Sequence, residues 1–182
     1  IHWGAFLRAD LRDEPGDPRR GGLYEFRWTS FYDRDSHLFD FRRYEVDLRH
    51  FLPSFRERDT IAVRAHTILS QKRSGQQVPF FLQPTAGGGG DLRGYNQYRF
   101  RDENALVLNL EYRWRVREIL QAVGLADAGR VFHRPSQIGL AGLRGSAGAG
   151  GRIKLGERIL LGADLGWSPD GLHLWFRAAH SF

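Results

Sequence analysis

Residues 104–115 alternate between two kinds of side chain without a slip, and this constrains the fold more than any other feature. One row is apolar and becomes aromatic at its end: Leu106, Leu108, Leu110, Tyr112 and Trp114. The other row is polar or charged after its first member: Val107, Asn109, Glu111, Arg113 and Arg115. A period of two predicts a β-strand whose faces meet different surroundings. The charged row predicts a wet, crowded interior, and the aromatic end of the other row predicts a membrane interface.

Similar alternation recurs along the chain and predicts an all-β, antiparallel architecture of about nine strands. The expected strands are 2–12, 22–33, 38–52, 60–71, 104–115, 117–130, 142–155, 158–168 and 172–182. In the third strand Phe39 and Phe41 are out of phase with the residues that follow, which predicts a bulge near Arg42 and Arg43. Short turns alternate imperfectly with longer connections, of which the loop 72–103 is much the longest. Such a pattern is typical of transmembrane β-barrels, and a loop of this length is expected to have a function.

The composition agrees with a membrane barrel and weakens the other classes of protein. The sequence has no apolar run long enough for a transmembrane helix. Its mean hydropathy of −0.47 does not exclude a membrane protein, because polar residues inside a barrel dilute the average. The net charge is +6, but arginines alternate with carboxylates at strand spacing, so nucleic acid is not an expected partner. The absence of cysteine excludes disulfides and thiolate metal sites.

Three segments in fixed order carry a family resemblance. They are LRGY followed by YRFRDENALVLNLEYRW, then GLADAGRVF at 124–132, then the C-terminal run DLGWSPDGLHLWFRAAHSF. Together they resemble the BamA/TamA superfamily of outer-membrane assembly and secretion barrels. Bacterial single-chain barrels close with even strand numbers, whereas nine strands are expected here. The resemblance and this parity together predict that residues 1–182 are the C-terminal half of a 16-stranded transmembrane β-barrel and that the chain is a piece of a longer protein.

The resemblance implies that the long loop points into the lumen of the barrel and forms a site there. Arg93 is expected to pair with acids on the two strands that follow, and by motif these are Glu111 and Asp127. Gly94 and Tyr95 complete the loop tip. A planar guanidinium suits two carboxylates, and the alternation places Glu111 on the inner row. The alternative is that Arg93 is an ordinary solvated loop arginine.

The last strand is a second candidate. Leu174, Phe176 and Phe182 stand at even spacing and are expected to face outward. They resemble the signal by which outer-membrane barrels are recognised for insertion, which would act by strand addition at a sheet edge. The alternative is an ordinary edge strand.

No catalytic residue, metal site or cofactor is expected. The histidines are scattered without metal-ligand spacing. The run GGGGDLRG lacks the GK[ST] ending of a phosphate-binding loop, and a strand follows it rather than a helix. Asp13, Glu14 and Asp17 lie in a turn rich in proline and glycine, and we expect them at the surface.

The resemblance implies a non-enzymatic protein of the bacterial outer membrane that helps to insert outer-membrane proteins or translocates polypeptides. Its expected partners are the lipid bilayer, client outer-membrane or secreted polypeptides, and accessory assembly proteins. One alternative is a passive pore, or a secretion barrel for an N-terminal passenger domain. Another is a soluble barrel that binds a small ligand, which requires an apolar interior and a polar exterior.

Overall fold

The structure is a computed structural model that describes residues 1–35, 38–54, 56, 58–155, 159–178 and 182. Its main strands are β1 (His2–Asp10), β2 (Gly21–Phe31), β3 (Phe41–Pro53), β4 (Thr60–Lys72), β7 (Asn104–Arg117), β8 (Leu120–Phe132), β9 (Arg144–Leu155), β10 (Ile159–Ser168) and β11 (Gly171–Arg177). Each main strand overlaps one of the nine predicted segments, so the all-β prediction is confirmed. The ninth prediction, 172–182, includes residues 179–181, which lie outside the described residues.

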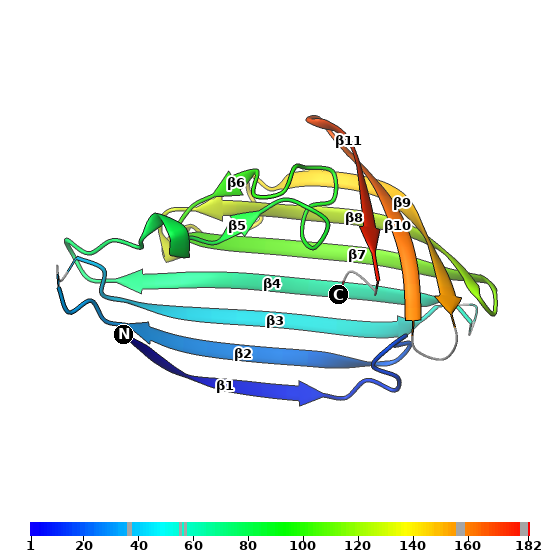
Figure 1. The fold of residues 1–182 in the computed structure, drawn as a ribbon, viewed down its shortest axis with the longest axis horizontal. Helices are drawn as coiled ribbons and strands as arrows, with labels where there is room; N and C mark the ends of the chain where they lie inside the picture. Colours follow the sequence, from blue (N-terminus) through cyan, green and yellow to red (C-terminus); the bar gives the residue numbers. More distant parts are fainter. Residues whose placement is uncertain (36–37, 55, 57, 156–158, 179–181) are drawn as a thin grey trace.

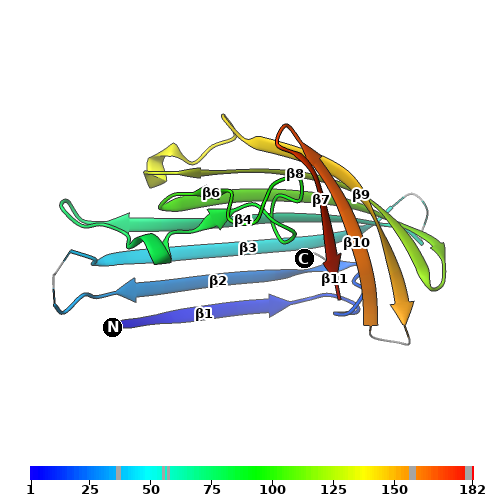
Figure 2. The ribbon, with the colours of Figure 1, turned by 45° about the horizontal axis from the view of Figure 1, so that its top comes forward.

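The nine strands form one antiparallel sheet in the order β1-β2-β3-β4-β7-β8-β9-β10-β11. Every neighbour in space is therefore the next long strand in sequence, which is the simplest up-and-down arrangement. Figures 1 and 2 show that the sheet curls, with β10 and β11 bending over its concave side. The connection from β4 to β7 lies within that concave side, so the curvature and the loop together create an interior.

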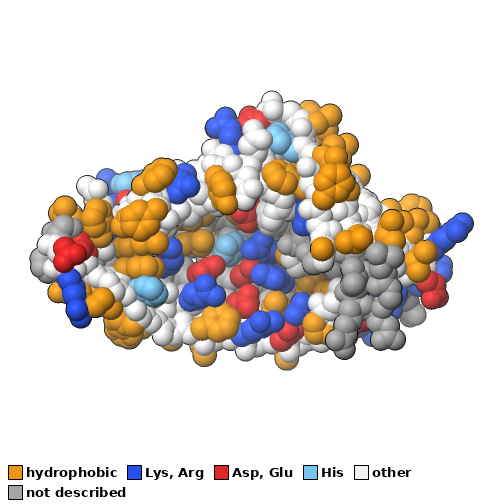
Figure 3. All heavy atoms as spheres, in the orientation of Figure 1, with side chains coloured by type: hydrophobic (Ala, Val, Ile, Leu, Met, Phe, Trp, Pro, Cys, Tyr) orange, Lys and Arg blue, Asp and Glu red, His pale blue; other side chains and the backbone are white. Residues whose placement is uncertain are grey.

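The two faces of β7 have the environments that the alternation predicted. On the convex face Leu110, Tyr112 and Trp114 are exposed, with exposures of 46%, 41% and 47%. On the concave face Asn109, Glu111 and Arg113 are buried. Figure 3 shows acidic and basic side chains gathered in the hollow of the concave face. This arrangement is the reverse of a soluble barrel, so the soluble alternative is wrong.

Two local predictions are wrong. The register between β3 and its neighbours is unbroken from Phe41 onward, so there is no bulge near Arg42 and Arg43. Phe41 instead lies on the inner face, where it is buried and stacks on Phe31 at a ring distance of 4.4 Å. Asp17 is buried rather than at the surface, because it accepts hydrogen bonds from Arg115 and Gln121 at the ends of β7 and β8.

The long loop also differs from a structureless connection. It contains the short 3-10 helix η1 (Phe80–Leu82) and a small ladder between β5 (Thr85–Ala86) and β6 (Phe100–Arg101). A second 3-10 helix, η2 (Pro135–Gln137), follows β8. Among the described residues, no helix combines the length and the apolar character that a membrane crossing requires.

Candidate functional site

The tip of the long loop reaches the concave face of the sheet through a run of glycines. Gly87 and Gly88 adopt positive φ angles of 120° and 102°, a backbone region that glycine enters without a Cβ penalty. The Gly88 amide donates to the carbonyls of both Leu92 and Tyr95. These bonds close the chain into a compact turn, and Leu92, Arg93 and Tyr95 within it are buried. The glycines therefore direct Arg93 toward the wall.

Arg93 is held by acids from the wall, and its exposure is only 1%. Its Nε and Nη2 donate to the two carboxylate oxygens of Asp127 on β8, at 2.9 and 2.6 Å. Its Nη1 donates to Glu111 on β7 and lies 3.6 Å from Asp164 on β10. The Arg93 amide also donates to Asp127, at 3.0 Å. The bidentate pair with Asp127 uses the planar fork of the guanidinium, which a lysine could not reproduce.

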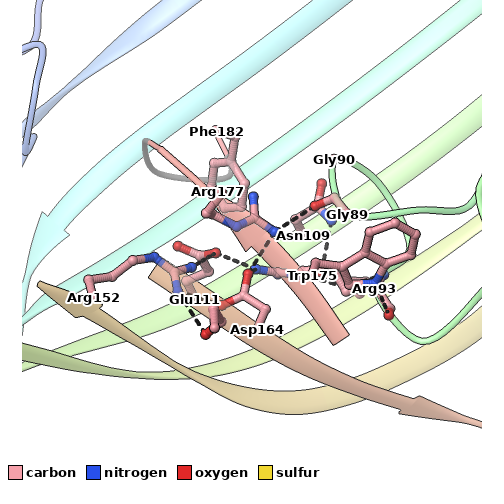
Figure 4. A network of polar contacts seen from close by, with 12 residues as sticks. Gly89, Gly90, Arg93, Asn109, Glu111, Arg152, Asp164, Trp175, Arg177 and Phe182 are labelled. Carbon is pink, nitrogen blue, oxygen red and sulfur yellow. Dashed lines mark hydrogen bonds and ion pairs between the residues drawn. The ribbon is translucent and has the colours of Figure 1, made fainter. Parts of the chain in front are cut away.

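Three more arginines surround these acids, of which Figure 4 labels Arg152 and Arg177. Arg113 donates to Glu111 at 2.8 Å, while Arg152 and Arg177 approach Asp164 at 2.5 and 2.7 Å. Arg152 lies on β9 and Arg177 on β11, so the network joins five strands to the loop. Buried charges are stable only when they are paired and hydrogen-bonded. Here Glu111 and Asp164 each lie near at least two arginines, and Asp127 pairs with Arg93 and accepts a further hydrogen bond from Asn109.

Electrostatics keep Arg93 charged in this buried position. Burial alone lowers the pKa of a guanidinium, because it penalises the charged form. The hydrogen bond with Asp127 and the negative charge of Glu111 act in the opposite direction, and the net effect raises the pKa of Arg93 above its ordinary value. The loop tip therefore carries a permanent positive charge into a set of negative ones.

Gly94 and Tyr95 fit the wall closely. A Cβ on Gly94 would lie 2.6 Å from the Ser146 Cβ and 2.7 Å from the Trp167 carbonyl oxygen, so any larger residue must displace the loop or the wall. Tyr95 donates its hydroxyl to the Gly145 carbonyl at 3.1 Å. Its ring packs in a small apolar cluster with Ala86, Leu92 and Val107. The structure thus places all three tip residues against the sheet.

Sequence reasoning missed part of this network. The alternation of residues 159–168 places Asp164 opposite the row of Leu161, Ala163 and Leu165, but no local pattern indicates that it lies near Arg93. Arg152, Trp175 and Arg177 were not candidates either. Their positions follow from the curl of β9–β11 over the loop (Figure 2), which local alternation does not encode. The available signal was the alternation of the last strand, which places Arg177 on the face opposite to Leu174 and Phe176.

The C-terminal candidates do not share one face. Leu174 and Phe176 are exposed on the convex side of β11, at 56% and 80%, as predicted. Phe182 is buried at 7%, and the prediction that it faces outward is wrong. It packs against Phe51 and Ala62 of the inner wall, and the Arg113 guanidinium lies 5.7 Å from its ring centre. Alternation predicted that the Phe182 ring faces lipid, whereas in the structure it lies near the Arg113 guanidinium, a favourable cation–π contact.

Across the part of the chain that the structure describes, no group of three or more His, Asp or Glu side chains could hold a metal ion. The concave site is a set of ion pairs between the loop tip and the wall.

A family model, the Omp85 superfamily domain, matches residues 4–170. The chain belongs to the Omp85 superfamily. The crystal structure of BamA from Haemophilus ducreyi lacking POTRA domains 1-3 has a similar fold, with a TM-score of 0.75 and 14% sequence identity. The match covers 94% of this chain and 40% of that one. No curated protein matches the chain in sequence.

This Omp85 chain is thus an antiparallel β-sheet of the kind that forms part of the BamA barrel. Membership of the superfamily supports a location in the bacterial outer membrane.

Proposed function

We propose that this chain belongs to an outer-membrane barrel that assists the insertion of client barrel proteins, or the passage of polypeptides, across the bacterial outer membrane. The chain spans less than half of the BamA chain that it resembles. Each edge of its sheet, β1 and β11, is paired on one side within the described residues. Because an open edge in lipid leaves backbone groups unsatisfied, the nine strands are part of a larger closed barrel in this proposal.

The observation that carries the proposal is the buried contact of Arg93 with Glu111 and Asp127. It fastens the tip of a long loop to the inner wall, where the loop occupies the lumen. A passive pore needs an open lumen, whereas a machine that handles polypeptides needs a wall held in a defined shape. In this proposal Arg93, Gly94 and Tyr95 maintain that shape.

The convex face supports the bilayer as a partner. It carries exposed apolar and aromatic side chains on several strands, which would be costly in water over so large an area. Examples from the second half of the sheet are Leu110, Tyr112, Trp114, Leu165, Trp167, Leu174 and Phe176. Aromatic rings near the strand ends suit the two membrane interfaces.

The last strand supports recognition of this barrel during its own assembly. Leu174 and Phe176 project from the edge strand, and Phe182 remains part of the proposed signal in the chain before it folds. In the folded state Phe182 is buried, so the proposed recognition precedes folding. Client polypeptides and accessory assembly proteins are the proposed protein partners.

The test compares Arg93→Ala with Arg27→Ala in the intact protein, since Arg27 is an exposed arginine on the same concave face. The readout is the amount of folded client barrel, or of secreted polypeptide, per unit of correctly folded protein in the outer membrane. We expect Arg93→Ala to lower it by about an order of magnitude and Arg27→Ala to leave it unchanged. Parent-like output from Arg93→Ala, with greater ion conductance, would favour the passive pore instead.

A further inference from the structure

The wall holds the loop by its backbone as well as by the Arg93 side chain. Five carbonyls between Gly89 and Gly94 accept hydrogen bonds from wall side chains, and Figure 4 labels both partners of the bonds from Arg177 to Gly89 and from Trp175 to Arg93. The donors are Arg177 to Gly89, Arg64 to Gly90, Asn109 to Asp91, Trp175 to Arg93, and Ser168 to Gly94. These contacts do not depend on loop side chains, so they form an anchorage separate from the acid pocket.

Part of this anchorage follows a single cross-strand row. Arg64 on β4 pairs in register with Asn109 on β7, Asn109 with Asp127 on β8, and Asp127 with Ser146 on β9. Along the loop, Gly90 contacts the first of these residues, Asp91 the second and Arg93 the third. The segment therefore crosses the strands, and Arg64 is the end of the row farthest from the acid pocket.

The segment from Gly90 to Arg93 is held at both of its ends. The Gly90 carbonyl accepts from Arg64, and the Arg93 amide donates to Asp127. Between these contacts the Asp91 carbonyl accepts from Asn109, and the turn itself is closed by the Gly88 amide, which donates to the Leu92 carbonyl. A turn that is held at both ends has little freedom to move along the wall.

Arg64 is itself fixed in place. Its Nε and Nη2 donate to both carboxylate oxygens of Asp47 on β3, each at 2.9 Å. This leaves Nη1 for the Gly90 carbonyl at 3.0 Å, and the same nitrogen lies 3.6 Å from the Asp91 carboxylate. Arg49 also binds Asp47, at 2.7 Å, but among the described residues it has no hydrogen bond or ion pair with the loop. The neighbouring strand thus supplies a matched control.

We propose that Arg64 is a second positioning residue of the long loop, which grips the Gly90 backbone from β4 and so determines where Arg93 enters its acid pocket. The proposal rests on the proposed function of the loop, and it adds a residue outside the family motif. It predicts that loss of Arg64 loosens the loop tip even though the contacts of Arg93 with Glu111 and Asp127 remain chemically possible.

The test measures the reactivity of a thiol at the loop tip in the intact protein in outer-membrane vesicles. The 182 residues contain no cysteine, so Leu92→Cys introduces a single thiol in this region at a fully buried position. Its labelling rate with a maleimide is compared in the parent background, Arg64→Ala, Arg64→Met and Arg49→Ala. Arg64→Met keeps most of the side-chain volume without a donor. Heat-modifiable mobility on gels verifies that each barrel is folded.

We expect labelling about tenfold faster in Arg64→Ala and Arg64→Met, and a parent-like rate in Arg49→Ala. A parent-like rate in the folded Arg64→Met protein would overturn the proposal, as would equal acceleration by Arg49→Ala. The same samples are tested for client output. Faster labelling with undiminished output would contradict the proposed function of the loop and leave Arg64 as its anchor. Lost output with parent-like labelling would agree with the proposed function of the loop and contradict the role of Arg64 as its anchor.

Discussion

Two parts of the inner wall carry the same alternating charges but use them differently. Under the loop, on β7–β10, the side chains of Glu111, Asp127 and Asp164 have 0% exposure and bind arginines. Beside the loop, Glu25 and Glu45 on β2 and β3 keep 23% and 29% exposure. Glu25 approaches its arginine neighbours at 3.7 Å, and a cavity of 230 Å³ opens next to it.

The difference teaches that a charged row becomes a site only where something excludes water from it. Ion pairs in water are screened and contribute little, whereas buried pairs interact strongly and are costly to break. The loop supplies the exclusion on β7–β10. The four predictions below test this contrast, from the largest expected effect to the smallest.

The largest effect is expected from the two arginines that represent the two parts of the wall. Arg93→Ala should lower the free energy of unfolding by about 3–5 kcal/mol, because it leaves buried acids without their shared cation. Arg27→Ala should lower it by about 0–1 kcal/mol. Urea titration in phospholipid vesicles measures both. Equal losses would show that burial under the loop does not strengthen the pairs.

The second prediction compares two glycines of the same loop. Gly94→Ala should cost about 1–3 kcal/mol, since its Cβ meets β9 and β10 at less than 3 Å. Gly90→Ala should change stability by less than about 0.5 kcal/mol, because nothing lies within 4 Å of the added Cβ. The same titration applies, and a neutral Gly94→Ala would mean that the loop tip is not seated against the wall.

The third prediction concerns two tryptophans near the last turn. Trp175→Phe removes the donor to the buried Arg93 carbonyl and should cost about 1 kcal/mol. Trp167 is exposed on the convex face, so its replacement by Phe should cost less. Thermal unfolding followed by tryptophan fluorescence of the remaining residues compares the two. A larger loss for Trp167→Phe would reverse the assignment of the inner and outer faces.

The smallest effect is expected where the wall lies open. Glu25→Gln should change the free energy of unfolding by no more than about 0.5 kcal/mol, because its ion pairs are long and solvated. Glu111→Gln is the counterpart under the loop and should cost several times more. If Glu25→Gln costs more than Glu111→Gln in urea titration, the contrast between the two parts of the wall is wrong.

Local alternation predicted much of the fold. A period of two assigns each residue of β7 to a face without knowledge of the partner strand, and Glu111 and Arg113 are buried as a result. The period of two also holds at Phe41, where the predicted bulge is wrong because an apolar residue can lie on the inner face when another ring stacks on it. Alternation failed at Phe182, which lies outside β11, because that strand ends at Arg177 and a strand period applies only within the strand.

The sequence by itself determined the strands, the two faces of each strand and the inward direction of the charged row, since all three depend on near neighbours along the chain. Tertiary structure alone decided which charges meet. The contacts of Arg93 with Asp164, and of Arg64 with Gly90, require the register of several strands, the curl of the sheet and the path of the loop together. Each of these depends on residues far apart in the chain, so no local pattern contains them.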